Sequence, residues 1–372
     1  MSAGARSQSP TTPPKPALGP SDAASSPLRP GRPALGGCAR EVHSGVGTRL
    51  RAMALIVASL SLTALPACTF WGQTSSSSES ESGSGSDSDD SATSTAVDPE
   101  NVSIATFNVR LFFDTTCDSG KCNGDDFEEV ATPTSFEKRA DELAAAIVDV
   151  DADILLLQEI ENQNCIDALA ERLPHYSSVH LGEQGYPASL DTAVFATLPA
   201  MAVFSHQDEN FPHPEGGETS FTRDLLEVHF DLEGARIIVF AAHFRSKVFD
   251  DPGRRLAEAQ RAGEWLAARA TEHPDALIVL GGDLNDTPGS PPLTALETAA
   301  EVDRIASELD DDSTYVYSGK SQAIDHLYMA TTDAGSHVSD SSVIFRVTTS
   351  DGWSGWGGSD HAALRSSFAV HP

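Results

Sequence analysis

Apolar residues recur along the second part of the chain with two periods, one typical of strands and one typical of helices. Residues 102–109 alternate between apolar and polar and are rich in β-branched side chains, which predicts a strand. Residues 153–159 and 276–283 are apolar runs that end in polar residues, as buried strands do. Residues 136–150 place apolar side chains three and four positions apart, which predicts an amphipathic helix.

The same two periods continue along the chain. Further helices are expected at 165–173, 254–270 and 291–299, and further strands at 176–181, 191–196, 201–205, 222–232, 235–243, 324–329, 341–347 and 362–370. Strands outnumber helices, and the helices interrupt them mainly in pairs. This order predicts an α/β fold, a four-layered α/β sandwich in which two packed β-sheets are flanked by helices.

The first hundred residues differ in composition and are not expected to fold. Residues 1–48 are rich in Pro, Ser, Ala and Gly without apolar periodicity, so they are either disordered or an over-extended gene start. In residues 49–68, two arginines precede an apolar run that ends in small residues, which predicts a signal peptide rather than a membrane-spanning helix. Its last four residues, LPAC, are similar to a bacterial lipobox, in which Cys68 carries the lipid; in an ordinary signal peptide Cys68 would be incidental.

Residues 69–99 connect the signal peptide to the rest of the chain. They are largely Ser, Gly and acidic residues, the composition of a flexible, self-repelling tether. We therefore expect an exported protein, either lipid-anchored to the cell envelope through Cys68 or extracellular. Residues 100–372 are expected to form one folded domain and a monomer.

The chain is strongly acidic, with 55 Asp and Glu against 24 Lys and Arg and a formal net charge of −31. Such a negative field opposes non-specific capture of polyanions such as DNA or anionic lipid. It indicates either a salt-tolerant, solubility-driven surface or a substrate that is not a long polyanion. Divalent cations at a site would reverse the sign locally, so a nucleic-acid substrate is not excluded.

Three cysteines fall within the expected domain. Cys117 and Cys122 flank a short polar loop, and in an exported protein this spacing favours a loop-closing disulfide. Cys165 is left over and is expected to be a buried small residue rather than a nucleophile.

Polar clusters stand where the apolar runs end, which is the pattern of one site assembled from distant segments. In chain order they are Phe107–Asn108, Gln158–Glu159, His243 with Arg245 and Lys247, Gly282–Asn285, Ile324–His326 and Ser359–His361. Because Glu159 ends a buried strand, its carboxylate can point into a crevice and hold a hard cation such as Mg²⁺; the alternative is a strand end that faces solvent.

Two of these clusters suit phosphate chemistry. Asp283 and Asn285 are two positions apart and can share one side of the chain. A carboxylate there can orient or deprotonate a water, and an amide can donate to an anionic oxygen; the alternative is an ordinary turn. His243, Arg245 and Lys247 either present donors to a phosphate or form a solvated basic patch.

The two Asp-His dipeptides complete the set. They are Asp325–His326 and Asp360–His361. A carboxylate that binds one imidazole nitrogen fixes the tautomer and raises the basicity of the other nitrogen. Such dipeptides are common by chance, so each gains its weight from the other clusters.

The order of these residues resembles the endonuclease/exonuclease/phosphatase (DNase I-like) superfamily, closest in appearance to its exported bacterial nuclease-like members. The motifs GGDLND and SDH carry most of the likeness, which covers nearly all of residues 102–370. The resemblance implies the four-layered sandwich and makes residues 100–372 a catalytic domain. It implies three metal ligands, with Glu159 as the principal one and Asn108 and Asp360 assisting. Mg²⁺ is the expected ion, although Mn²⁺ or Ca²⁺ would suit the same ligand types.

The resemblance also implies the catalytic residues. They are His361, Asp283, Asn285, His243, Asp325 and Arg223. In this scheme Asp325 orients His361 against the scissile phosphate, and Asp283 positions the attacking water. The other three contact phosphate oxygens.

The function implied is metal-dependent hydrolysis of phosphodiester bonds, by a secreted or surface-tethered nuclease of low sequence specificity. One alternative is a phosphatase or phospholipase C-type hydrolase acting on inositol phosphates or phospholipid head groups, for which a protruding apolar hairpin would be expected and none is evident. Another is a non-catalytic surface binding module. A nuclease would carry a basic or aromatic groove, for which the candidates are Lys320, Arg254, Arg255, Trp353 and Trp356.

Overall fold

The computed structural model describes residues 100–371, apart from residues 125, 249 and 351. The disordered start, signal peptide and tether expected within residues 1–99 lie outside the described residues. Within the described part of the chain, no helix combines the length and the apolarity needed to cross a membrane.

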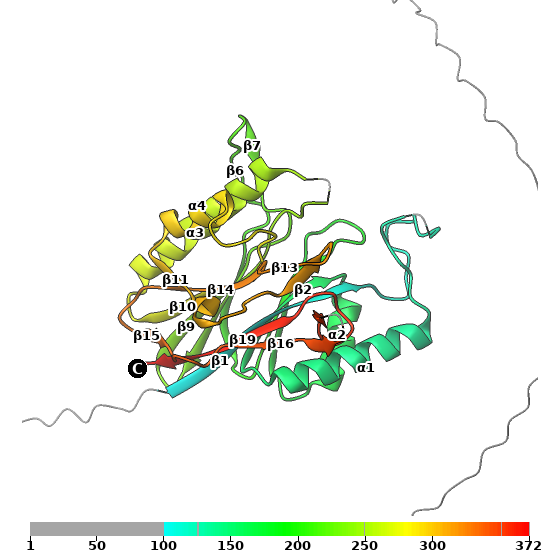
Figure 1. Ribbon diagram of the computed structural model, residues 1–372, viewed down its shortest axis with the longest axis horizontal. Coiled ribbons are helices and arrows are strands. Elements are labelled where there is room, and N and C mark those ends of the chain that lie inside the picture. Colours follow the sequence, from blue (N-terminus) through cyan, green and yellow to red (C-terminus); the bar gives the residue numbers. More distant parts are fainter. Residues whose placement is uncertain (1–99, 125, 249, 351, 372) are drawn as a thin grey trace, which may run out of the picture. The chain divides into compact units, whose positions relative to one another are not determined.

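The domain contains two large β-sheets (Figure 1). The first, sheet A, has seven strands, in the order β15-β19-β1-β2-β4-β3 with β16 also paired to β19. Its strands are β1 (Glu100–Phe112), β2 (Ile154–Ile160), β3 (Ser178–Gly182), β4 (Asp191–Ala196), β15 (Gly335–His337), β16 (Val343–Phe345) and β19 (Ala363–Val370). Its one parallel pair is β1 with β2, so the carboxyl ends of these strands meet at the same edge.

Sheet B has six strands, in the order β11-β14-β10-β9-β8-β5. They are β5 (Ala200–Ser205), β8 (Leu226–Leu232), β9 (Ala235–His243), β10 (Ala276–Asp283), β11 (Val302–Arg304) and β14 (Asp325–Ala330). Here β9 and β10 form the parallel pair, and β8 and β9 form an antiparallel hairpin.

Four α-helices and several short elements complete the domain. The helices are α1 (Pro133–Val150), α2 (Gln163–Arg172), α3 (Pro252–Glu272) and α4 (Pro291–Ala299), and Ile305–Glu308 is a 3₁₀ turn. Three small hairpins pair β6 (Phe211–Pro212) with β7 (Glu218–Thr219), β12 (Tyr315–Tyr317) with β13 (Lys320–Gln322), and β17 (Val347–Thr349) with β18 (Gly352–Ser354). The β6–β7 hairpin projects beyond the helices α3 and α4 in Figure 1.

Three apolar cores separate the layers. One lies between the sheets and includes Ile104, Leu156 and Val279, all fully buried. A second lies between the outer face of sheet A and the helices α1 and α2, and a third lies between sheet B and the helices α3 and α4. Leu155 belongs to the second core although its neighbour Leu156 belongs to the first, which explains why β2 is apolar without alternation. The predicted four-layered sandwich is confirmed.

Some predicted boundaries were wrong. The strand expected at 222–232 begins only at Leu226, because Thr222 binds Glu258 through its backbone N–H and its hydroxyl, and the Asp224 carboxylate accepts the backbone N–H of His206. The strand expected at 341–347 is divided between β16 and β17. The short hairpins were not predicted, since two- and three-residue strands carry too few positions to show a period.

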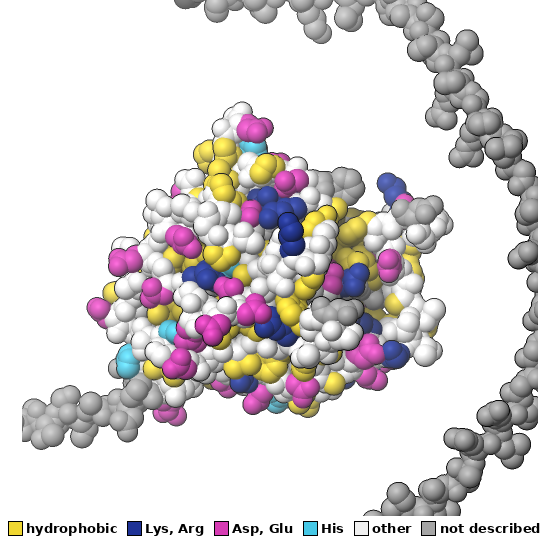
Figure 2. All heavy atoms as spheres, viewed as in Figure 1, with side chains coloured by type: hydrophobic (Ala, Val, Ile, Leu, Met, Phe, Trp, Pro, Cys, Tyr) yellow, Lys and Arg dark blue, Asp and Glu magenta, His cyan; other side chains and the backbone are white. Residues whose placement is uncertain are grey.

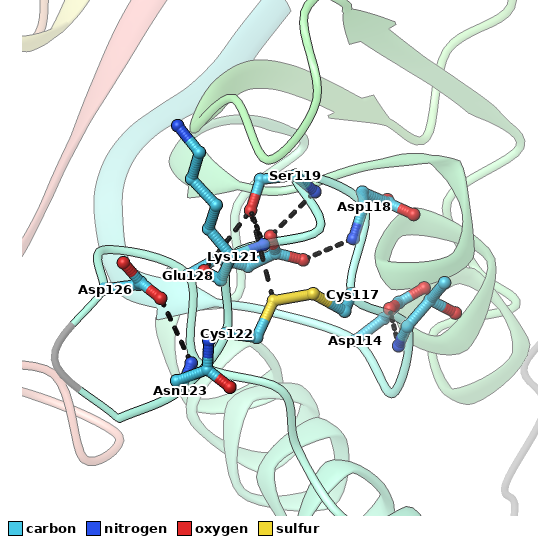
Figure 3. The surroundings of a disulfide bond; sticks show 10 residues. Asp114, Cys117, Asp118, Ser119, Lys121, Cys122, Asn123, Asp126 and Glu128 are labelled. Carbon is cyan, nitrogen blue, oxygen red and sulfur yellow. Dashed lines mark hydrogen bonds between the residues drawn. A yellow bond between two sulfur atoms is a disulfide. The ribbon is translucent and has the colours of Figure 1, made fainter.

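The disulfide predicted between Cys117 and Cys122 is present, and it closes the loop that leads from β1 to α1 (Figure 3). Cys165 is a free, buried thiol, as expected. Its Sγ lies 3.1 Å from the carbonyl oxygen of Phe112, and burial raises the pKa of the thiol, so it is poorly suited to act as a nucleophile.

Candidate active site

Irregular backbone at the ends of β1 and β2 turns Glu159 toward its neighbours. Register shifts interrupt the pairing of both strands, one between Asn108 and Phe112 and one between Gln158 and Ile160. Glu159 has a φ of 66°, a left-handed conformation that costs energy for a residue with a Cβ. Strained backbone of this kind concentrates at functional sites.

The Asn108 side chain joins the two sheets. Its Nδ2 donates to Oε1 of Glu159 at 3.1 Å and to Oδ2 of Asp283 at 3.0 Å. Glu159 belongs to sheet A and Asp283 to sheet B, so one amide bridges both layers. The second oxygen of Glu159 accepts the backbone N–H of Leu111 at 2.8 Å. These bonds fix the Glu159 carboxylate from two directions.

Asp283 lies at the centre of a row across sheet B. The strand register places it beside His243 on β9 and beside Asp325 on β14. Its Oδ1 accepts the backbone N–H of Asn285, and the Asn285 amide donates to the carbonyl of Phe244 at 3.1 Å. Burial and the nearby carboxylate of Asp325 raise the pKa of Asp283 to about 7.

His361 is held by a carboxylate on one nitrogen. Its Nδ1 lies 2.9 Å from Oδ2 of Asp325, and its Nε2 lies 3.9 Å from Oδ2 of Asp283. Ser359 positions the loop, because its Oγ donates to the carbonyl of Asn108 and accepts the backbone N–H of His361. Burial would lower the pKa of His361, but the charge and hydrogen bond of Asp325 raise it to about 10.

Two polar nitrogens next to this group have no partner among the described residues. They are Nδ1 of His243 and Nε of Arg223. The other ring nitrogen of His243, Nε2, lies 3.6 Å from Oδ2 of Asp283, and an Arg223 nitrogen lies 3.5 Å from the carbonyl of Phe244. Burial and the positive charge of Arg223 lower the pKa of His243 well below its usual value. Unpaired buried polar atoms are costly, so their presence here favours a ligand-binding role.

Asp360 is not hydrogen-bonded to Glu159 or Asn108 in the described part of the chain. Its partly exposed carboxylate lies 3.6 Å from Nε of Arg110, and its charge contributes to the raised pKa of His361. His326 lies elsewhere: it is buried, and its Nε2 donates to the carbonyl of Asp286. The structure therefore brings together every other predicted site residue.

The buried charges suit a divalent cation. Ligand-type atoms of Asp283, Asp325 and His361 lie within 4.8 Å of one another. However, the Asp325 carboxylate is already hydrogen-bonded to Nδ1 of His361. Glu159 and Asn108 face the same space from the other sheet. Three carboxylates around one point repel each other unless a cation compensates them, so this donor set fits a metal ion.

Two contributors to the active site were not predicted from the sequence. The ring of Tyr315 lies 4.7 Å from the ring of His361, and the two residues form a β-bridge. The backbone N–H of Leu111 supports Glu159. Tyr315 lies outside the polar clusters that end the apolar runs, and a backbone donor leaves no mark in a sequence.

Three of the five candidate groove residues are bonded within the domain. Arg254 and Arg255 are bound internally, to backbone carbonyls and to Asp250 and Asp286. The indole N–H of Trp356 donates to the carbonyl of Ala146. Of the five candidates the remaining two are Trp353, which stacks on Arg346, and Lys320, which is exposed on β13.

The fold and the site together define an α/β sandwich whose acidic centre fits a divalent cation. Residues 105–361 match the model of the Endonuclease/Exonuclease/phosphatase family, and the chain belongs to this family. Membership supports phosphoric-ester hydrolase chemistry, and the enzymes of the family generally depend on divalent metals. No curated protein sequence matches the chain.

Solved structures share the fold at low sequence identity. An endonuclease/exonuclease/phosphatase from Bacteroides vulgatus is 16% identical with a TM-score of 0.51, over 73% of this chain and 99% of its own. Humanised D. rerio TDP2 is 15% identical with a TM-score of 0.50, over 72% and 98%. Sphingomyelinase C from Streptomyces griseocarneus is 16% identical with a TM-score of 0.48, over 72% and 99%. The first two support the assigned fold.

Proposed function

We propose that the protein is a metal-dependent nuclease of low sequence specificity, exported and tethered to the cell envelope through a lipidated Cys68. The observation that carries the catalytic part is the bridge from Glu159 through Asn108 to Asp283, which assembles donors from both sheets at one point. The His361–Asp325 pair adjoins the same carboxylate.

Glu159 and Asn108 are the residues proposed to hold the cation, with Mg²⁺ as the expected ion. A bound cation would compensate negative charge on a phosphoryl oxygen and on the leaving group. Asp360 would join these ligands only after leaving its ion pair with Arg110. That pair is about half exposed, so separating it costs little.

The remaining residues have roles that follow from their positions. Asp283 is proposed to hold the attacking water, because its carboxylate lies between His243 and His361. His361, fixed by Asp325, keeps Nε2 directed toward that space and can donate to a phosphate oxygen. The unpartnered nitrogens of His243 and Arg223 supply further donors, as does the second amide hydrogen of Asn285.

The surroundings of the site favour a nucleic acid over a lipid. The β12–β13 hairpin, attached to His361 through Tyr315, carries Tyr317 at 62% exposure and the exposed Lys320. An aromatic ring and a cation beside the site suit stacking on a base and contact with its phosphate. The projecting β6–β7 hairpin carries exposed prolines but no large exposed apolar side chain, and its Phe211 is buried, so it offers no aromatic or aliphatic tip for membrane insertion.

The proposed export has support from two features. Residues 49–68 have the pattern of a signal peptide with a lipobox-like end. The Cys117–Cys122 disulfide is typical of proteins that fold in an oxidising compartment.

The test is a substrate panel with the full-length chain and Mg²⁺: plasmid DNA, single-stranded DNA, RNA, phosphoinositides and sphingomyelin. We expect nucleic acid to be cleaved and Glu159→Gln and His361→Gln to lose at least about 100-fold in kcat. Glu171→Gln, an exposed change on α2, is the matched control and should keep full activity. Cleavage of a lipid with nucleic acid left intact would replace the proposal by the phospholipase alternative. No turnover above that of the two variants would favour the binding module.

A further inference from the structure

The β12–β13 hairpin is held in one conformation by its turn. Its two-residue loop consists of Ser318 and Gly319, whose φ values are 49° and 73°. Two left-handed residues in such a loop are typical of a type I′ turn, whose twist matches that of a hairpin and fixes the register of its strands. The positions of the hairpin's side chains are therefore set before any ligand binds.

This register places four side chains on one face of the hairpin, which we call the platform. Tyr315 pairs with Gln322, and Tyr317 pairs with Lys320. Side chains two positions apart on a strand point the same way, as do side chains directly opposite each other on paired strands. The intervening pair of residues points to the opposite face. The platform therefore combines two phenol rings, one amide and one cation.

The platform is turned toward His361. The ring centroid of Tyr315 lies 4.7 Å from that of His361. Burial and the negative charges of Asp360 and Asp283 raise the pKa of the Tyr315 hydroxyl, which agrees with a position at the edge of the site. Tyr317 lies two residues further along the strand, which corresponds to about 7 Å. The platform thus leads from the active site toward the tip of the hairpin.

Thr314 connects the base of the hairpin to the two segments that carry Asp325 and His361. It is fully buried. Its Oγ1 accepts the backbone N–H of Asp325 at 3.0 Å, and its carbonyl oxygen accepts the backbone N–H of Ala362 at 2.7 Å. Ala362 follows His361 directly. A ligand on the platform is therefore held at a defined distance from the His361–Asp325 pair.

The outer half of the platform is accessible to a ligand. Tyr317 is 62% exposed, and Lys320 is exposed as well. Neither side chain forms a hydrogen bond or an ion pair with another residue that the structure describes. A ring that is mostly exposed buries little apolar area, so Tyr317 contributes little to the stability of the domain. These two side chains are available to stack on a planar group and to pair with an anion.

We propose that the platform binds single-stranded nucleic acid, with an unpaired base stacked on Tyr317 and a phosphate bound by Lys320. This inference rests on the proposed nuclease function. Stacking on an aromatic ring accepts any base, which agrees with low sequence specificity. Within a duplex the faces of the bases are covered by their neighbours, so an unpaired base is the one that Tyr317 can reach. One lysine on a chain with 55 acidic and 24 basic residues also neutralises too few phosphates to hold a duplex by charge.

The test measures binding to the full-length chain at low ionic strength in EDTA, where no metal-dependent cleavage takes place. Fluorescence anisotropy follows a short labelled oligo(dT) and a labelled oligo(U), the two sources of such a strand, and a closed circular duplex is added as competitor. We expect Tyr317→Ala to weaken binding of at least one strand roughly 5- to 100-fold, and Tyr317→Phe, which keeps the ring, to restore most of the affinity. Lys320→Gln should lower the slope of log affinity against log salt by about 0.7. Lys121→Gln, an exposed change in the disulfide loop, is the control.

Kinetics in Mg²⁺ give a second readout that general damage would not reproduce. On a single strand, Tyr317→Ala should raise KM by a similar factor and change kcat less than about twofold. Equal affinities of Tyr317→Ala and Tyr317→Phe, competition by the circular duplex as strong as by unlabelled oligo(dT), or no binding of either strand would overturn the platform. Cleavage of nucleic acid with KM unchanged in Tyr317→Ala would overturn the platform alone and leave the nuclease proposal standing. Binding as expected without any cleavage would overturn the nuclease proposal and support the platform.

Discussion

At the scale of single residues, the site consists of side chains whose neighbours restrict them to one orientation. His361 is fixed by Asp325, and Glu159 by Asn108 and the N–H of Leu111. The sequence predicted these side chains because each follows an apolar run. It could not predict the left-handed backbone at Glu159, which depends on register shifts between strands that are far apart along the chain.

The role of Asp325 can be tested by Asp325→Asn. The variant keeps the shape but removes the charge that holds His361, so kcat should fall by roughly 100- to 1,000-fold while KM changes little. Steady-state kinetics on the cleaved substrate measure both constants. Asp303→Asn, exposed on the neighbouring strand β11, should leave both unchanged. An equal loss in KM and kcat for both variants would point to a structural effect instead.

At the scale of elements, the site depends on how closely β9 and β10 approach each other. A Cβ on Gly282 would lie 1.8 Å from the carbonyl oxygen of Ala242, so no other residue fits there. Gly282 thus permits close contact within the parallel pair that aligns His243 with Asp283.

Gly282→Ala should therefore lower the free energy of unfolding by at least about 3 kcal/mol, since a backbone carbonyl cannot move aside as a side chain can. Urea unfolding followed by circular dichroism measures the loss. Gly289→Ala separates the clash from the backbone strain, because Gly289 also has a positive φ, of 76°, but has no atom near the added Cβ. Gly289→Ala should lower the free energy of unfolding by only about 1–2 kcal/mol. An equal loss of stability in the two variants would refute the steric explanation.

At the scale of the whole molecule, acidic side chains dominate the surface. Asp and Glu are scattered over the face seen in Figure 2, with Lys and Arg in a few groups between them. Composition predicted this surface, and the apolar periods predicted the layers. Neither could predict that Arg254 and Arg255 would be used internally. Arg254 binds the carbonyls of Ser220 and Phe221, and Arg255 pairs with Asp250 and Asp286, contacts that arise only after the chain has folded.

One buried carboxylate links sheet B to α3 and should govern unfolding in acid. Glu227 accepts hydrogen bonds from His206, His229 and Arg269. Burial would raise the pKa of Glu227, but these three partners lower it below its usual value. The unfolded chain therefore binds a proton more readily, and the free energy of unfolding falls as pH drops below about 5.

Glu227→Gln should lower the free energy of unfolding by roughly 3 kcal/mol at neutral pH. The difference in this free energy between the variant and the natural protein should shrink as pH falls from about 5 to about 3. Unfolding curves in urea across this pH range test the sign. Glu301→Gln, a change on the exposed surface, should show the same dependence of the free energy of unfolding on pH as the natural protein. A difference that stays constant with pH would show that ionisation of Glu227 is not the cause.

The position of β19 in sheet A has a consequence for the time at which the enzyme becomes active. This strand is the last one in the described part of the chain, yet it lies between β15 and β1 and pairs with β1 from Glu100 to Thr106. His361 stands two residues before it, so the histidine reaches Asp325 only after residues 361–370 have emerged and docked. A nascent chain released early, or still on the ribosome, lacks this histidine. Under the proposed function, a chain that ends before His361 therefore has an incomplete site and should hydrolyse no phosphodiester.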